Sequence, residues 1–230
     1  MAQLHGRRIA ITGAAGSLGA AVVRAALAAG ATVAAIDHAP LPSADTVNLH
    51  EFGGVDLSSE AAVEKTFRAI GEKLGGLDAL INVAGTFRWE KVEGGKLATW
   101  DSLFNVNLRT AVASCMAALP LLAQSKAGRI VNIGAAGAVK AGAGMGAYAA
   151  SKAGIFKLTE ALAEELKDRG ITVNAILPTT IDTPANRSDM PDADHDRWVK
   201  PEQIADVILF LLSDQAQAVT GALIPVAGRT

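Results

Sequence analysis

Short apolar runs alternate with longer amphipathic stretches along the chain. The apolar runs have the length of strands and are almost continuously hydrophobic, as in parallel strands covered on both faces. They span 8–12, 32–37, 79–82, 129–133, 172–177 and 222–226. The helical stretches between them span 17–29, 59–74, 99–125, 148–169 and 201–212. This alternation predicts βαβ units, and therefore an α/β fold with one doubly wound parallel sheet of about seven strands and helices on both faces.

Two segments interrupt the alternation, although no repeat or linker divides residues 1–230, which we expect to form a single domain. Residues 134–147 are rich in Gly and Ala, as a flexible linker would be. They lie between a strand and a helix, however, where α/β sheets place ligand-binding loops. Residues 179–200 are polar and hold Pro184 and Pro191. For this segment we favour a substrate lid over a disordered loop.

A glycine-rich turn, Thr12-Gly13-Ala14-Ala15-Gly16-Ser17-Leu18-Gly19, follows the first strand and opens the first helix. Glycine allows the backbone to turn tightly and to approach a pyrophosphate closely. The helix start then offers free N–H groups and the positive end of the helix dipole to the phosphates. The strand-turn-helix context therefore predicts a dinucleotide site of the Rossmann type, in preference to a purely structural turn.

An acidic residue, Asp37, ends the second apolar run, about where a carboxylate would meet the hydroxyls of the adenosine ribose. Such a carboxylate also repels a 2′-phosphate, and residues 14–17 contain no Arg or Lys. The sequence therefore favours NAD(H), with NADP(H) as the less favoured cofactor. The alternative is that Asp37 only ends a strand or forms a turn.

Composition excludes several classes of function. The formal net charge is −2 and the chain has no basic stripe, so neither nucleic acid nor an anionic membrane surface is an expected partner. Cys115 is the only cysteine, which excludes an internal disulfide and suits a cytoplasmic location. The first apolar run breaks at Thr12, so it is not read as a signal peptide. The four histidines are scattered without metal-ligand spacing, and no metal is expected.

Several further motifs are similar to those of one family, the short-chain dehydrogenases/reductases. The glycine turn matches the T-G-x-x-x-G-x-G spacing of that family, and Asn82-Val83-Ala84-Gly85 matches N-N-A-G with one change. Tyr148-Ala149-Ala150-Ser151-Lys152 matches Y-x-x-x-K. Other matches are the adenine-contacting pair Asp56-Leu57, the helix residue Asn107, and Pro178 and Thr183 of P-G-x-x-x-T, in which Thr179 replaces the glycine.

The resemblance implies a nicotinamide-dependent oxidoreductase that forms a homodimer or homotetramer and acts on a small-molecule substrate. The resemblance, together with the glycine turn and Asp37, also indicates which residues contact the cofactor. These are Gly13, Ala15, Ser17, Leu18, Gly19, Asp37, Asp56, Leu57, Asn82, Ala84, Gly85, Tyr148, Lys152, Pro178, Ile181 and Thr183.

Tyr148, the only tyrosine, and Lys152 are the candidate proton-transfer pair. A phenol titrates near ~10. Lys152 lies at i+4 on the same helix face, and its charge should favour the phenolate and lower the pKa of Tyr148. The resemblance adds Asn107 to a water chain that relays the proton. The alternatives are a buried core tyrosine, a surface lysine and an ordinary asparagine.

One departure from the family concerns the serine that lies 13 residues before the tyrosine and hydrogen-bonds the substrate carbonyl, because that position holds Ala135. We expect a substrate unlike a simple ketone. The segments 144–148, 177–187 and 190–194 resemble the dihydropteridine reductase branch, which is NADH-linked, also lacks the serine and reduces a quinonoid dihydropterin. The alternative is a non-catalytic NAD-binding regulator that lost turnover together with the serine.

Apolar side chains near these motifs are candidates for contact with a flat substrate. They are Phe87, Trp89, Met145, Met190 and Trp198. The alternative is that Phe87 or Trp89 packs in the core and that Trp198 anchors the lid.

Overall fold

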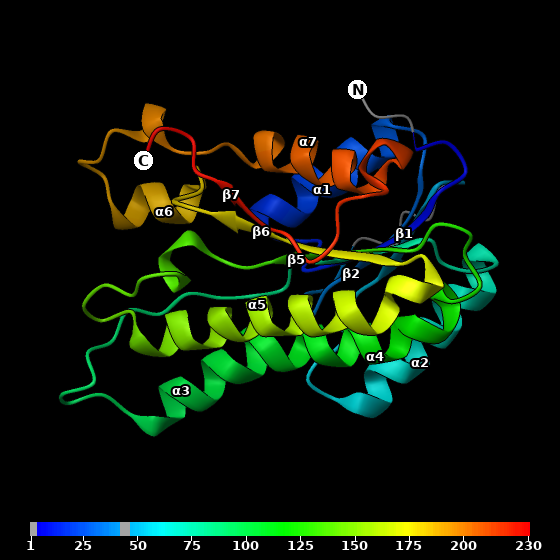
Figure 1. The fold of residues 1–230 in the computed structure, drawn as a ribbon. Coiled ribbons are helices and arrows are strands. Elements are labelled where there is room, and N and C mark those ends of the chain that lie inside the picture. The colour runs from blue at the N-terminus through cyan, green and yellow to red at the C-terminus, as the bar shows by residue number, and fades with distance from the viewer. Residues whose placement is uncertain (1–3, 42–46) are drawn as a thin grey trace.

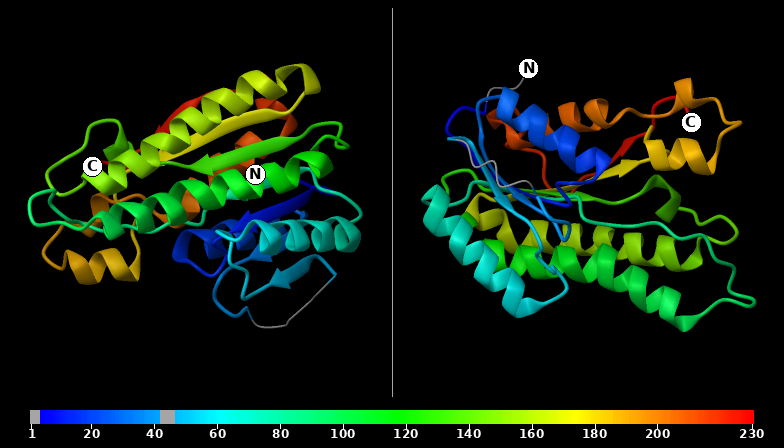
Figure 2. Two further views of the ribbon diagram at one scale, coloured as in Figure 1. Left: turned by 90° about the horizontal axis from the view of Figure 1, so that it is seen from below. Right: turned by 180° about the vertical axis from the view of Figure 1, so that it is seen from behind.

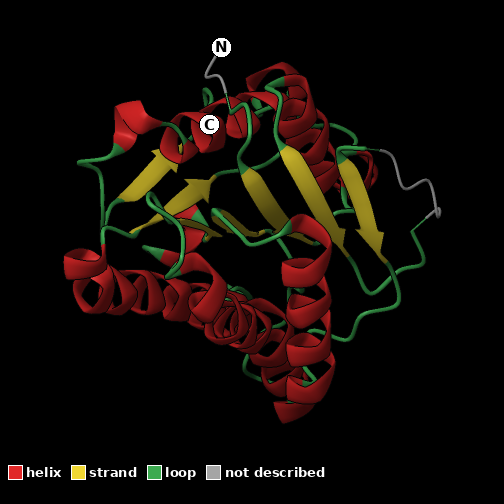
Figure 3. Cartoon of the chain, turned by 90° about the vertical axis from the view of Figure 1, so that its right-hand side faces the viewer, coloured by secondary structure: helices red, strands yellow, loops and turns green. Residues whose placement is uncertain are grey.

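All seven strands of the computed structural model, which describes residues 4–41 and 47–230, lie parallel in one sheet (Figure 3). Their order is β3-β2-β1-β4-β5-β6-β7, so the strand order reverses between β1 and β4: β2 and β3 are added on one side of β1, and β4 to β7 on the other. The strands are β1 Arg8–Thr12, β2 Thr32–Ile36, β3 Leu49–Phe52, β4 Ala79–Asn82, β5 Arg129–Ile133, β6 Thr172–Pro178 and β7 Leu223–Val226. The prediction of a doubly wound parallel sheet is confirmed.

β3 is the one strand that the hydrophobic pattern does not mark. Its sequence is Leu-His-Glu-Phe, and all four residues are partly exposed. It pairs in parallel with β2 at the edge of the sheet. An edge strand buries less of its surface than a central one, so it needs no continuous apolar run, and that is why the pattern misses it.

Helices cover both faces of the sheet, as Figures 1 and 2 show. One face carries α1 and α7, which pack against each other. The other carries α2, α4 and α5, with α3 packed against α5. The helices are α1 Ser17–Ala28, α2 Glu60–Leu74, α3 Leu97–Phe104, α4 Thr110–Leu122, α5 Gly146–Leu166, α6 Pro184–Asp189 and α7 Pro201–Leu212. Two large hydrophobic clusters, one on each side of the sheet, form the core.

The stretch expected to be helical over 99–125 is helical from Leu97 to Leu122, but it is not one regular α-helix. The chain forms α3, a π-helical turn at Asn105–Arg109 and then α4. Within the turn the amide of Thr110 donates to the carbonyl of Asn105, and its hydroxyl donates to that of Val106 at 2.6 Å. A π turn inserts one residue without changing the apolar pattern enough to be seen, and such turns often mark functional sites.

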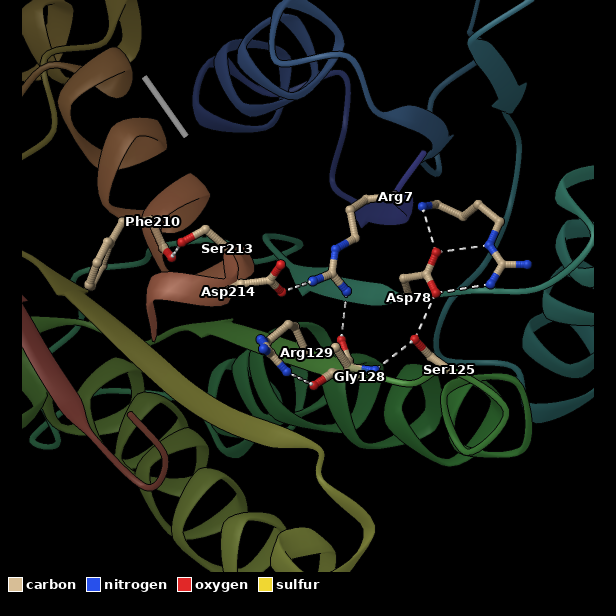
Figure 4. A network of polar contacts seen from close by, with 10 residues as sticks. Arg7, Asp78, Ser125, Gly128, Arg129, Phe210, Ser213 and Asp214 are labelled. Atoms are coloured by element: carbon tan, nitrogen blue, oxygen red, sulfur yellow. Dashed lines mark hydrogen bonds and ion pairs between the residues drawn. The ribbon is translucent and has the colours of Figure 1, made fainter. Parts of the chain in front are cut away.

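The amino-terminal edge of the sheet is closed by a polar network (Figure 4). The Arg8 guanidinium donates to both oxygens of Asp78, from Nε at 2.8 Å and from Nη2 at 2.9 Å. The Ser125 hydroxyl donates to the same carboxylate at 2.7 Å, and Arg7 pairs with Asp214 nearby. Burial alone would raise the pKa of Asp78, but these hydrogen bonds and the Arg8 charge outweigh it and hold the pKa at about 2.

The two irregular segments contain short helices. Ala136–Ala138 is a 3₁₀ turn within 134–147. The expected lid, 179–200, contains α6 and a second 3₁₀ turn at His195–Arg197, and Ile181 bridges to Val199 at its base. No helix in the described part of the chain is long and apolar enough to cross a membrane.

Candidate active site

A cavity of about 1640 Å³ lies over the carboxyl ends of the strands. The loops that follow β1, β2, β3, β4, β5 and β6 all contribute to its wall. Doubly wound sheets bind ligands at this edge, at the point where the strand order reverses. The volume exceeds the roughly 300–1,000 Å³ of most small-molecule pockets, which suits a dinucleotide and a second molecule together.

The glycine turn leaves no room for side chains at two positions. A Cβ on Gly19 would lie 2.0 Å from the carbonyl oxygen of Gly13. Gly13 has a φ of +67°, and a Cβ there would lie 2.7 Å from the amide nitrogen of Ala84. The backbone of the turn is therefore packed closely against the loop after β4, as a phosphate-binding turn requires.

The start of α1 fits an anion. Its N-cap is Gly16, which offers no side-chain cap, and its first turn holds no acidic residue. Ser17, Leu18 and Gly19 of this turn line the cavity. The uncapped N–H groups and the positive end of the helix dipole therefore face the space in which a pyrophosphate would lie.

Two carboxylates line the cavity beyond β2 and β3. Asp37 accepts hydrogen bonds from the amide nitrogens of Ala15 at 2.9 Å and Ala39 at 2.8 Å. Asp56 accepts from both the hydroxyl and the amide of Ser58, which lowers its pKa. The amide of Ala15 is thus engaged by Asp37, and Ala15 does not line the cavity wall.

Below the cavity, polar side chains tie β1, β4 and β5 together. The Thr12 hydroxyl accepts from the amides of Val83 at 3.1 Å and Ala84 at 3.2 Å. Asn82 donates from Nδ2 to Oδ1 of Asn132 at 2.9 Å. Asn82 is buried and outside the cavity wall, so its side chain supports the floor of the site and does not reach a ligand.

Tyr148 lies in the first turn of α5 and Lys152 one turn later, and both line the cavity. The buried ammonium of Lys152 donates to the carbonyl of Ile133 at 2.8 Å. Burial raises the pKa of Tyr148 to about 12 and lowers that of Lys152 to about 8. The prediction that Lys152 lowers the pKa of Tyr148 is therefore wrong for this structure, because the ammonium is turned to Ile133 and burial dominates.

The side chain of Asn107 is held within the protein, although the sequence suggested a water relay. Its Oδ1 accepts from the amide of Thr86 at 2.7 Å, and its Nδ2 donates to the hydroxyl of Ser151 at 3.0 Å. Asn107 is buried and does not line the cavity. It fixes the loop after β4 to α5. Gly85 lies beside it, and a Cβ at Gly85 would lie 3.0 Å from both Asn107 Oδ1 and Lys152 Nζ.

The remaining wall of the cavity is largely apolar. Ala135, at the position of the missing serine, is buried and lines the cavity. Phe87 and Trp89 line it with 52% and 55% of their surface exposed, and Met145 and Met190 line it as well. The Trp89 indole is held by a 2.9 Å hydrogen bond from Nε1 to the carbonyl of Ala143.

Trp198 does not belong to the cavity wall. It is buried, and its ring centroid lies 4.4 Å from that of His195. The neighbouring Val199 forms the bridge with Ile181, which joins the two ends of the 179–200 segment. The alternative, that Trp198 anchors this segment, agrees with its position.

The structure brings all of the other expected cofactor contacts to the cavity wall. These are Gly13, Ser17, Leu18, Gly19, Asp37, Asp56, Leu57, Ala84, Gly85, Tyr148, Lys152, Pro178, Ile181 and Thr183. It also adds residues outside the expected set, among them Thr86, Asn186 and Thr230. Thr86 directly follows the N-V-A-G motif, which could have indicated it. Thr230 lies at the wall with its hydroxyl bonded to that of Thr179, a long-range contact with no local signal.

No group of three His, Cys, Asp or Glu residues within 4–41 and 47–230 has a metal-binding arrangement.

Comparisons with known proteins agree with this geometry. A family model described as enoyl-(acyl carrier protein) reductase matches residues 13–228. The 3-oxoacyl-(acyl-carrier-protein) reductase FabG of Thermotoga maritima is 33% identical and covers 98% of each chain. The D-threitol dehydrogenase of Mycolicibacterium smegmatis is 32% identical, over 98% of this chain and 93% of its own. A glucose/ribitol dehydrogenase structure from Brucella melitensis has a TM-score of 0.89 at 28% identity, over 99% of this chain and 97% of its own.

Fold, cavity and likeness together define the class as Rossmann-type oxidoreductases that use a nicotinamide cofactor. Within this class, the chain belongs to the short-chain dehydrogenase/reductase family. The names of these relatives point to different substrates, a ketone on an acyl carrier protein in one and a sugar alcohol in another.

Proposed function

We propose that the protein is an NAD(H)-dependent reductase or dehydrogenase in which Tyr148 donates or accepts the proton. The observation that carries the proposal is the position of Tyr148 and Lys152, one helical turn apart, on the wall of the cavity that the glycine turn also lines. A proton donor and a phosphate-binding turn in one cavity are what hydride transfer to a carbonyl or imine needs.

The described residues fit a dinucleotide. The uncapped start of α1 would hold the pyrophosphate, and Asp37 would accept hydrogen bonds from the adenosine ribose. Because its carboxylate repels a 2′-phosphate, NAD(H) is preferred over NADP(H). Asp56 and Leu57 would border the adenine, and Pro178, Ile181 and Thr183 the nicotinamide end. When bound, the nicotinamide supplies or takes up the hydride.

Tyr148 acts as the acid in the direction of reduction. With a pKa of about 12 it is protonated at neutral pH and is ready to donate to an oxygen or nitrogen that gains negative charge. Lys152 is the only cation on this part of the wall among the described residues, and its ammonium would stabilise the phenolate that remains after proton transfer once it turned from the Ile133 carbonyl toward the phenol. Asn107 keeps the loop and α5 in register and so positions both groups.

Ala135 restricts the substrate. A hydrogen-bond donor to a developing oxyanion is typically worth about 2.7–4 kcal/mol, and a methyl group supplies none. A conjugated acceptor such as a quinonoid imine spreads its charge, so one proton donor can suffice. The apolar wall formed by Phe87, Trp89, Met145 and Met190 suits a flat molecule, which supports a dihydropteridine reductase-like activity as the specific form of this function.

The test is the rate of NADH oxidation with quinonoid dihydropterin and with a panel of small ketones, in the wild type and in Ala135→Ser. We expect turnover of the dihydropterin, slow turnover of the ketones, and faster ketone turnover in Ala135→Ser. Ordinary ketone turnover by the wild type, unchanged by the serine, would contradict the role of Ala135.

The second candidate is a non-catalytic NAD-binding regulator, which the lost serine favours. It predicts NADH binding without turnover of any acceptor and no effect of Tyr148→Phe on any measured property. The Tyr148 and Lys152 pair argues against it, because binding alone needs no proton donor.

The proposal extends to the whole chain as one domain whose 179–200 segment closes over the substrate. Thr179, Thr180, Asn186, Asp189 and Met190 of this segment line the cavity, which supports a lid. The family resemblance supports a homodimer or homotetramer. The single cysteine supports a cytoplasmic location. Size-exclusion chromatography with light scattering tests the oligomeric state.

A further inference from the structure

The phenol of Tyr148 lies against the ring of Phe87. The two ring centroids are 4.9 Å apart and the planes meet at 80°, an edge-to-face contact. Phe87 comes from the loop after β4 and Tyr148 from the first turn of α5, so the contact joins two elements at the cavity. Phe87 is half exposed and belongs to none of the hydrophobic clusters formed by the described residues. Core packing therefore does not account for its position.

The surroundings of the Tyr148 hydroxyl are otherwise poor in polar partners. Within the described part of the chain, no side chain or backbone group hydrogen-bonds this hydroxyl, while the backbone carbonyl of Tyr148 accepts from Ser151. Ala135 presents a methyl group at the position where the family has a serine hydroxyl. An apolar neighbour such as Phe87 therefore has a large influence on how much water reaches the phenol.

Few charges face this part of the cavity. Lys152, on the same helix, has its ammonium turned to the carbonyl of Ile133. Asp189 at the end of α6 is the charged wall residue of the 179–200 segment. The wall residues from the loops after β4 and β5 are uncharged, and Asp37, His38 and Asp56 line the part of the wall beyond β2 and β3.

We propose that Phe87 is a positioning residue whose ring orients the phenol of Tyr148 and shields it from water, so that the phenol remains a protonated acid. Its value for catalysis rests on the proposed function, whereas the shielding itself concerns only the two rings. Burial is the cause of the raised pKa of Tyr148, and the ring of Phe87 lies in edge-to-face contact with the phenol. Removing the ring should therefore make the phenol easier to ionise.

The sole tyrosine makes the test direct, because tyrosinate absorbance reports Tyr148 alone. The absorbance is followed after rapid jumps to alkaline pH, before the protein unfolds, and Tyr148→Phe supplies the blank. We expect Phe87→Ala to lower the apparent pKa of Tyr148 by about one unit relative to the wild type. Phe87→Leu, which keeps apolar bulk, should restore most of the difference.

The matched control is Val139→Ala, which removes an exposed apolar side chain that lies outside the cavity wall. It should titrate like the wild type. Titration of Phe87→Ala at the wild-type pH would overturn the proposal, and so would an equal shift in Val139→Ala. Circular dichroism checks that each variant folds, and Phe87→Val carries the same test if the alanine variant does not.

The titration uses the free protein, so its result does not depend on turnover. If the protein turns over, Phe87→Ala should shift the alkaline limb of the kcat profile in the same direction as the titration and leave the KM for NADH unchanged. Absence of turnover with the expected titration shift would refute the proposed function alone. Turnover without any shift would refute the role of Phe87 alone.

Discussion

The two edges of one sheet, at the amino and carboxyl ends of its strands, differ in the interactions that their polar groups make, although the amino-terminal edge also holds two buried atoms without a partner among the described residues, Arg129 Nε and Thr172 Oγ1. At the amino-terminal edge, the Asp78 carboxylate receives hydrogen bonds from Arg8 and Ser125 and closes the structure. At the carboxyl edge, the start of α1 is uncapped and the Tyr148 hydroxyl has no hydrogen-bond partner among the described residues. The amino ends of the strands thus carry interactions that stabilise the fold, and their carboxyl ends carry groups that are free to bind a ligand.

This difference shows which interactions each edge can lose. Removing a partner at the closed edge leaves a charged group without its counterpart, which lowers the free energy of unfolding. Removing the Tyr148 hydroxyl at the carboxyl edge breaks no hydrogen bond among the described residues. Its substitution should therefore affect turnover and hardly change stability, and substitution of Asp78 at the amino-terminal edge should do the reverse.

The largest effect is expected for Tyr148→Phe. Loss of the proton donor should lower kcat by about 10²–10⁴-fold, with the midpoint of thermal unfolding close to that of the wild type. Steady-state kinetics and calorimetry measure the two quantities. A variant that keeps its activity would contradict the role of the phenol, and one that loses stability instead would contradict the contrast between the edges.

The next effect concerns Asp78. Its pKa is about 2 in the folded protein against an ordinary value of 3.8, so the unfolded chain takes up the proton first. The stabilisation is therefore present above pH 3.8 and is lost as the pH falls toward 2. It amounts to about 2 kcal/mol. Asp78→Asn should lower the free energy of unfolding by a similar amount at neutral pH. It should also make this free energy depend less on pH between 3.8 and 2, which denaturant titrations at several pH values would record.

A smaller effect is expected for Asp37→Asn. The carboxylate should contribute about 1.5 kcal/mol to the ribose contact, so the Kd for NADH rises about tenfold. The affinity for NADPH should fall less or rise, because the repulsion of the 2′-phosphate is removed. Isothermal titration calorimetry with both cofactors decides the point. Equal losses for NADH and NADPH would argue against Asp37 as the residue that selects the cofactor.

The smallest effect serves as a control for the closed edge. Arg24 and Glu202 form an ion pair at 3.3 Å, and both side chains are exposed. Arg24→Gln should change the free energy of unfolding by less than about 0.5 kcal/mol. If Arg24→Gln and Asp78→Asn lowered the free energy of unfolding equally in denaturant titrations, burial would not be the reason that the Arg8–Asp78 pair stabilises the fold.

The sequence predicts those features that depend on local pattern. Central strands such as 129–133 appear as apolar runs, and the glycine turn is recognisable because its spacing is fixed by local geometry. β3 is missed because an edge strand needs little burial, and the π turn is missed because one inserted residue hardly alters the period. Both features are set by neighbours that are distant in sequence.

The sequence predicts which residues form the site more readily than it predicts their side-chain directions, contacts and pKa values. The spacing of Tyr148 and Lys152 places them on one helix face, yet the direction of the Lys152 ammonium depends on Ile133, which belongs to another strand. The contact of Phe87 with Tyr148 and the approach of Thr230 to Thr179 are likewise tertiary. The effect of burial on the Tyr148 pKa could not be foreseen without them.

A crystal structure of the protein with bound NADH tests the central claim most directly. The account predicts a nicotinamide ring that lies beside the Tyr148 phenol, a pyrophosphate at the start of α1, and an adenosine ribose against Asp37. A ring that lies far from Tyr148, or a cofactor bound outside this cavity, would contradict it.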